Sequence, residues 1–217
     1  MKMKKVRKAG WEKTATPEEI HLVDRVYEFA PLFGDMLFQK GAFTEWLGAK
    51  PSLDKKRRTW IYDMMGLPPQ LSRFSYDYFR FKVLSDGDKS EMPYYCHGDQ
   101  ELCVRQEDLD NDSTILHELI HLHLSCFLEL PQHFSDIYFW ALYQHVKQRI
   151  PRLDEIITQH ASNLAFEFPQ EDCSHSLTFL LKSFDLDMRK GYRLGTVFAY
   201  GLEGLFGDYA YIPYQKN

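Results

Sequence analysis

The stretch Ile115-Leu116-His117-Glu118-Leu119-Ile120-His121-Leu122-His123-Leu124 decides how this chain of 217 residues is interpreted. Aliphatic residues fill six of its ten positions, which favours a mostly buried helix. Within the stretch, His117, Glu118 and His121 form the pattern His-Glu-x-x-His (HExxH). Positions i and i+4 share one face of a helix, so the two imidazoles can reach one zinc ion at about 2.0–2.1 Å each.

The glutamate of the pattern indicates hydrolytic chemistry. Glu118 lies about 100° around the helix from His117, where its carboxylate can take a proton from a water beside the metal. Zinc lowers the pKa of such a water to about 7. Burying two imidazoles and a carboxylate in so apolar a helix costs free energy unless something binds them. We therefore expect Zn²⁺ as cofactor and Glu118 as general base; the alternative is a buried helix whose histidines bond to neighbouring backbone.

Residues 113–124, with a predicted strand just upstream at 101–106, resemble the zincin metallopeptidases, in particular gluzincin-like and ImmA/IrrE-like members. In zincins an edge strand precedes the HExxH helix, and the motif glutamate is the catalytic base. The resemblance implies hydrolysis of peptide bonds in a protein or peptide substrate that lies along the edge strand. It does not extend to the metzincins, because Leu124 and Phe127 stand where that group has Gly and a third His.

Local spacing does not identify a third metal ligand. If the helices predicted at 113–128, 133–149 and 152–168 form an up-down-up bundle, His160 reaches the height of the motif on an apolar helix face. Residues 160–167 are also similar to the second metal-binding helix of ImmA/IrrE-type regulatory metallopeptidases, which carries Glu at the position of His160. We expect His160 to be the third ligand, with a core histidine as the other interpretation. The candidates that stay open beside it are His133, His145, Asp136 and Glu155.

The remaining sequence predicts an α+β fold, a mainly helical zincin-like domain with a small antiparallel sheet next to the HExxH helix. Alternating apolar residues at 79–83 predict one strand, and the runs 94–96 and 102–104 around turn residues predict a hairpin. Thr16-Pro17-Glu18-Glu19 is typical of a helix start. Helices are expected at about 113–128, 133–149, 152–168 and 174–188.

The predicted organisation is a basic tail at residues 1–13 followed by a single domain over 14–217. That domain divides into an N-terminal helical part at 14–75, the sheet at 76–106, and the HExxH helix with the C-terminal helices at 113–217.

Charge and composition exclude several classes of protein. Lys and Arg number 26 against 31 Asp and Glu, a net charge of −5, so binding to nucleic acid is not expected. No run of 18 apolar residues predicts a membrane helix, and no apolar segment follows the basic N-terminus as in a secretory signal, so we expect a cytoplasmic protein without a membrane partner. The four cysteines form no Cys-x-x-Cys pair and predict no disulfide framework.

The function expected from the sequence is zinc-dependent peptide hydrolysis. One alternative is a non-catalytic binding or regulatory protein that keeps a zincin-like fold and a structural metal. Another is a nucleic-acid-associated protein that uses the basic clusters at 1–8 and 55–58. The sequence carries no signal for an oligomeric state.

Overall fold

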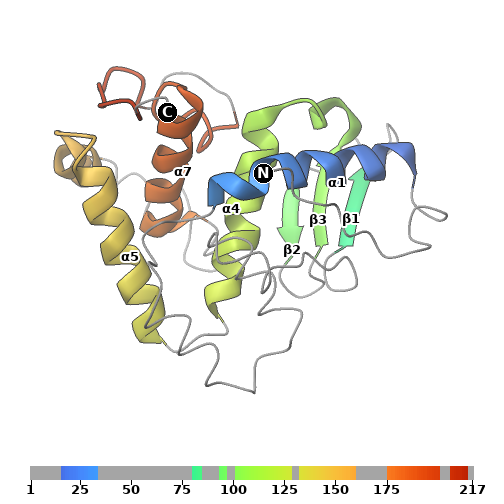
Figure 1. Ribbon diagram of the computed structural model, residues 1–217, viewed down its shortest axis with the longest axis horizontal. Coiled ribbons are helices and arrows are strands. Elements are labelled where there is room, and N and C mark those ends of the chain that lie inside the picture. Colours follow the sequence, from blue (N-terminus) through green and yellow to red (C-terminus); the bar gives the residue numbers. More distant parts are fainter. Residues whose placement is uncertain are drawn as a thin grey trace. The chain divides into compact units, whose positions relative to one another are not determined.

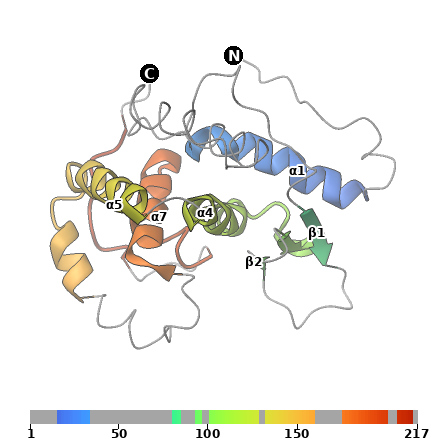
Figure 2. The ribbon, with the colours of Figure 1, turned by 90° about the horizontal axis from the view of Figure 1, so that it is seen from below.

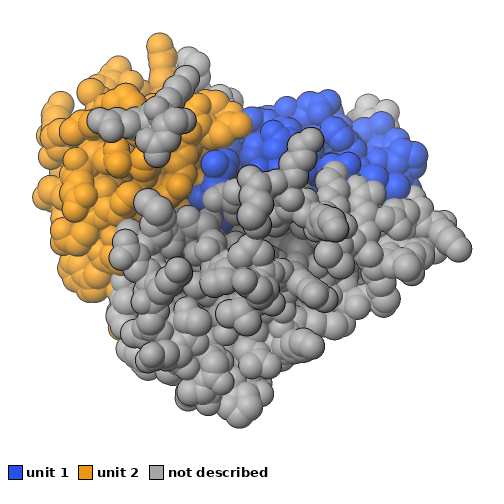
Figure 3. Space-filling model, viewed as in Figure 1, with its two compact units in different colours: residues 1–126 blue, residues 127–217 orange. Residues whose placement is uncertain are grey.

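The computed structural model describes residues 16–33, 80–84, 93–96, 101–128, 132–159, 175–200 and 206–214. Helices and strands are both present, which confirms the mixed α and β class (Figures 1 and 2). The chain divides into two compact units, residues 1–126 and 127–217 (Figure 3). The predicted tail at 1–13 and the basic cluster at 55–58 lie outside the described residues, and the division into a tail and one domain stays a prediction.

The first unit begins with helix α1, Pro17–Phe29, which continues into the 3-10 helix η2, Ala30–Phe33. The expected capping box is confirmed. The Thr16 amide donates to Glu19 Oε2 at 2.9 Å, and the Glu19 amide donates to Thr16 Oγ1 at 3.2 Å. Helix α1 lies along one face of the sheet (Figures 1 and 2). Its buried apolar side chains are Leu22, Val23, Val26 and Phe29.

Three strands form the sheet in the order β1-β3-β2, and their bounds are Arg80–Leu84 (β1), Tyr94–Cys96 (β2) and Glu101–Arg105 (β3). The hairpin is confirmed, because β2 and β3 pair antiparallel with Tyr94 opposite Cys103. The expectation of an antiparallel sheet is wrong for β1, which pairs parallel to β3 with Phe81 opposite Leu102. A parallel pair requires a long connection, and residues 85–100 between β1 and β3 are long enough to provide it. Since β2 pairs with one edge of β3, β1 pairs with the other edge.

Helix α4, Asp112–Leu128, carries the HExxH motif and follows β3 through the 3-10 helix η4, Gln106–Asp108. Asn111 caps α4, because its Oδ1 accepts hydrogen bonds from the Ser113 amide at 3.2 Å and from the Ser113 hydroxyl at 2.7 Å. The Asp112 carboxylate forms an ion pair with Arg25 of α1. The first turn of α4 is therefore fixed to the helix that lies along the sheet.

The second unit contains helices α5, Gln132–Lys147, and α7, Leu177–Lys190, which pack side by side (Figures 1 and 2). They confirm the helices expected at 133–149 and 174–188, with ends that differ by one to three residues. Residues 153–159 are also helical, and the rest of the helix predicted at 152–168 lies outside the described residues. None of the described helices has the length and apolar content needed to cross a membrane.

Candidate metal centre

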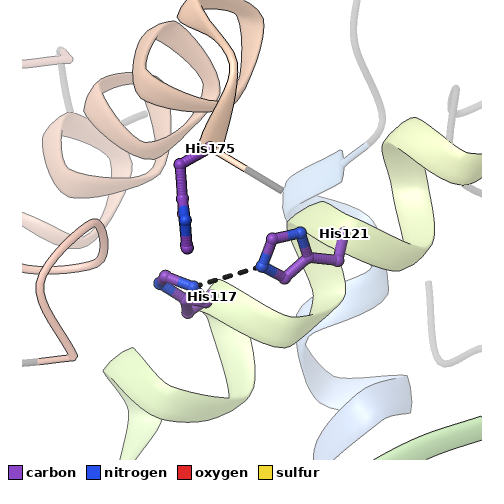
Figure 4. A group of neighbouring side chains, drawn as sticks. All are labelled: His117, His121 and His175. Atoms are coloured by element: carbon purple, nitrogen blue, oxygen red, sulfur yellow. Dashed lines mark hydrogen bonds between the residues drawn. The ribbon is translucent and has the colours of Figure 1, made fainter. Parts of the chain in front are cut away.

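The two motif histidines meet on one face of α4. The Nε2 atoms of His117 and His121 lie 3.3 Å apart, and their rings are inclined at 64°. The two nitrogens form a hydrogen bond (Figure 4), and their separation is just above the usual range of about 2.7–3.2 Å. Two nitrogens at about 2.0–2.1 Å from one tetrahedral zinc ion are about 3.3–3.4 Å apart. The pair therefore has the spacing of two ligands of one tetrahedral metal.

His175 is the third member of the group. His117, His121 and His175 each offer one nitrogen, and these three nitrogens lie within 4.8 Å of one another (Figure 4). In the part of the chain that the structure describes, this is the one such group of potential metal ligands. Imidazole suits zinc and other transition metals, whereas Ca²⁺ and Mg²⁺ take oxygen ligands. The donor set therefore fits Zn²⁺.

Burial differs among the residues of the motif. The side chains of His117 and Glu118 are fully buried, whereas His121 and His175 are half-buried. His123 is also buried, and its ring centroid lies 5.4 Å from that of Phe33. His123 therefore packs in the core of the first unit.

The ring of His175 is held by aromatic side chains of the second unit. His175 directly precedes Ser176, the N-cap of α7, whose side chain accepts a hydrogen bond from the Phe179 amide at 3.3 Å. The His175 ring makes edge-on contacts with Phe179 and Phe198, at centroid distances of 4.8 Å and 5.7 Å. Phe179 belongs to α7 and Phe198 to the loop at 191–200, so two separate elements restrict this ring.

The structure brings together two of the three expected ligands. His117 and His121 lie in the group, and His160 lies outside the described residues, so its role stays a prediction. The role of Glu118 as general base also stays a prediction. The sequence interpretation gave His175 no metal-binding role, because no motif surrounds this residue. The sequence signal that could have marked it is a histidine in the first turn of the helix predicted at 174–188.

Three of the other candidate ligands, His145, Glu155 and Asp136, are not members of the three-histidine group. Nε2 of His145 forms a hydrogen bond with the Tyr214 hydroxyl and lies 3.5 Å from Asp185 Oδ1. Glu155 accepts a hydrogen bond from Arg152 Nε at 2.7 Å, and this bond lowers the pKa of Glu155. Asp136 is exposed on α5, and the side chain of His133 is not among those described.

Two buried carboxylates on α7 have opposite electrostatic environments. Asp185 accepts hydrogen bonds from Lys182 Nζ at 2.9 Å, Arg189 Nε at 3.0 Å and the Tyr214 hydroxyl at 2.6 Å. Burial alone would raise the pKa of Asp185, but Lys182, His145 and Arg189 together hold this pKa well below its usual range. Asp185 is therefore an ionised centre of the second unit.

Asp187 binds backbone instead of cationic side chains. Its Oδ2 accepts a hydrogen bond from the Gly195 amide at 2.7 Å, and its Oδ1 accepts one from the Val197 amide at 2.9 Å. Burial raises the pKa of Asp187 to about 8, although the bonds from Val197 and Gly195 act in the opposite direction. This carboxyl group fixes the loop that carries Phe198.

Comparison with known proteins identifies no relative: no family model matches the chain, and neither a curated protein nor a solved structure matches it.

Proposed function

We propose that the chain is a zinc-dependent metallopeptidase whose metal is held by His117, His121 and His175. The observation that supports this function is the 3.3 Å separation of the His117 and His121 nitrogens, with the His175 nitrogen in the same group. Three imidazole ligands leave one position of a tetrahedral metal open. An open position distinguishes catalytic zinc from the four-ligand sites of structural zinc.

The residues of α4 provide the proton transfer that peptide hydrolysis needs. When bound, zinc supplies a Lewis acid that lowers the pKa of water to about 7 and polarises a carbonyl oxygen. Glu118 follows His117 directly and is fully buried, so its carboxylate acts in a medium of low dielectric constant. Glu118 takes a proton from the water that attacks the scissile carbonyl and then donates it to the leaving amine.

Burial of the motif favours a second candidate function. His117 and Glu118 are fully buried, whereas a peptide substrate must reach both the metal and its base. This burial favours the non-catalytic binding or regulatory protein, in which the metal contributes to folding instead of turnover. The two functions share the metal ligands and differ in the role of Glu118.

Elemental analysis of the purified full chain tests the ligand set. We expect about one zinc ion per chain, lost in His117→Ala and in His175→Ala but kept in Glu118→Gln and His160→Ala. A chain that takes up no zinc even after reconstitution contradicts the metal site. Zinc that is kept in His175→Ala and lost in His160→Ala assigns the third ligand to His160.

Hydrolysis of an unfolded protein such as casein tests the reaction. We expect cleavage by the zinc-loaded chain, no cleavage by Glu118→Gln, and restored cleavage when zinc is returned to chelator-treated protein. A chain that holds zinc and cleaves no substrate supports the non-catalytic alternative.

A further inference from the structure

The orientation of His175 depends on a side chain from the loop at 191–200. Phe198 packs edge-on against both the His175 ring and Phe179, at centroid distances of 5.7 Å and 6.0 Å. An imidazole that binds metal must present its nitrogen in a narrow range of directions, and neighbouring groups normally fix that direction. Within the second unit, the His175 ring contacts the aromatic rings of Phe179 and Phe198.

A buried carboxyl group fixes the loop that carries Phe198. Asp187 accepts the amide hydrogens of Gly195 and Val197, one on each carboxylate oxygen. Val197 directly precedes Phe198, so these bonds fix the position of the backbone next to Phe198. Asp187 is thus the polar anchor of this loop.

Gly195 allows the loop to lie against the aromatic core. Its φ of +90° lies in the left-handed region, and a Cβ at this position would meet Phe206 Cδ2 at 2.6 Å. The Phe206 ring in turn contacts Phe198 at a centroid distance of 6.1 Å. The loop is therefore fixed on one side by Asp187 and on the other by aromatic packing.

We propose that Asp187 is a positioning residue for the metal centre, which acts through the loop and Phe198 to hold the His175 ring in its ligand orientation. The inference rests on the proposed function, because it takes His175 as a metal ligand. Asp187 itself touches neither the metal ligands nor a substrate in the contacts described. Mutation of a group that orients a metal ligand typically lowers the affinity for the metal by about 10–100-fold.

The test is a comparison of zinc dissociation constants, measured on the full chain by competition with a chromophoric chelator. Asp187→Asn keeps the size of the side chain but places an NH₂ group against one of the two amide donors. We expect zinc binding to weaken by about 10-fold or more, and the visible absorption of the Co²⁺-loaded protein to change in position or intensity. Asp185→Asn is the matched control, a second buried carboxylate on the same helix without a bond to the loop. We expect that variant to lose stability but to keep the wild-type zinc dissociation constant and cobalt spectrum.

Two further variants separate failure of this inference from failure of the proposed function. Phe198→Leu removes the ring contact without touching Asp187, and we expect it to weaken zinc binding as Asp187→Asn does, with less than additive loss in the double variant. If Asp187→Asn does not fold, the zinc affinity of Phe198→Leu tests the inference in its place. If folded Asp187→Asn or Phe198→Leu binds zinc with wild-type affinity, the inference is wrong. If His175→Ala loses zinc in the same series, the proposed ligand set still holds. Wild-type affinity in His175→Ala instead contradicts the ligand set itself.

Discussion

His117 and His121 hold their Nε2 atoms 3.3 Å apart on successive turns of α4, the separation expected of two nitrogens on one tetrahedral zinc ion. The i, i+4 spacing of a helix places the two side chains on one face, where their rings can come this close. A metal that binds this pair binds the folded chain and not the unfolded one, so its binding free energy adds to the free energy of unfolding.

Removal of zinc is expected to lower the melting temperature of the wild-type chain. A ligand at 100 times its dissociation constant stabilises the folded state by about 2.7 kcal/mol. With free zinc at that ratio, we therefore expect EDTA to lower the free energy of unfolding by about this amount, measured by thermal or urea unfolding. His117→Ala is the control, in which EDTA should change nothing. Equal melting temperatures with and without EDTA in the wild type contradict the prediction.

Replacement of the motif glutamate is expected to separate catalysis from metal binding. A positioned general base contributes about 10²–10⁴-fold to a rate. We expect Glu118→Gln to lower kcat for peptide hydrolysis by a factor of this size and to leave the zinc content unchanged. The control is Glu155→Gln, because Glu155 is not a member of the three-histidine group and pairs with Arg152. A Glu118→Gln variant as active as the wild type assigns the general base to another residue.

The parts of the fold that depend on local sequence were predictable. The capping box of Thr16 and Glu19, the Asn111 cap and the motif helix depend on residues within a few positions of one another. The two strands of the hairpin followed from the runs at 94–96 and 102–104 and the turn residues between them. The meeting of His117 and His121 is also local, since both belong to one helix.

The features that depend on distant segments were not predictable from periodicity. Alternation shows that β1 is a strand but does not identify its partner, and the parallel pairing with β3 differs from the expected arrangement. His175 joins the group across a long stretch of chain, and no local spacing marks it. Asp187 stands in an ordinary amphipathic helix pattern, and only the position of the Gly195 loop gives it a role.

Asp185 is expected to stabilise the protein above about pH 4 and to lose that contribution in acid. Its folded pKa lies well below the ordinary value of 3.8, so its contribution is fully present above that value and is lost as pH falls toward the folded pKa. Asp185→Asn leaves Lys182 buried without this counter-charge, a change that typically costs about 3–5 kcal/mol. Urea unfolding of the zinc-free protein should show this difference at pH 7 and a smaller one at pH 2–3. A difference that is constant across this range contradicts the assignment.

Asp187 is expected to have the opposite pH dependence, although it lies two residues further along α7. Its folded pKa of about 8 lies above the ordinary value of 3.8. Between these values the folded protein keeps a proton that the unfolded chain has lost, so the free energy of unfolding falls as pH rises, by up to about 1.4 kcal/mol per pH unit. Asp187→Asn cannot titrate and should remove this slope. Urea unfolding of the zinc-free wild type and of zinc-free Asp187→Asn from pH 4 to pH 8 measures this slope. If the free energy of unfolding has the same pH dependence in both proteins, the shifted pKa is contradicted.

Two glycines after α7 provide a matched pair for testing the loop. Gly191 and Gly195 both have positive φ, at 74° and 90°, so alanine at either position incurs left-handed strain of about 1–2 kcal/mol. Around Gly191 no atom lies within 4 Å of the added Cβ, whereas at Gly195 the Cβ would meet Phe206 Cδ2 at 2.6 Å. We therefore expect Gly195→Ala to lower the free energy of unfolding by clearly more than Gly191→Ala, in urea unfolding at one pH.

The two glycine variants also distinguish backbone strain at the mutated residue from displacement of the loop at 191–200. If Gly195→Ala pushes the loop away from Phe206, the amide bonds to Asp187 and the contact of Phe198 with His175 should weaken together. Zinc binding should then weaken in Gly195→Ala and stay at the wild-type level in Gly191→Ala, whose residue only ends the helix. Equal losses of stability in the two variants show that Phe206 yields to the added methyl group. Unchanged zinc affinity in Gly195→Ala despite a larger loss of stability shows that the loop can shift without moving the His175 ring.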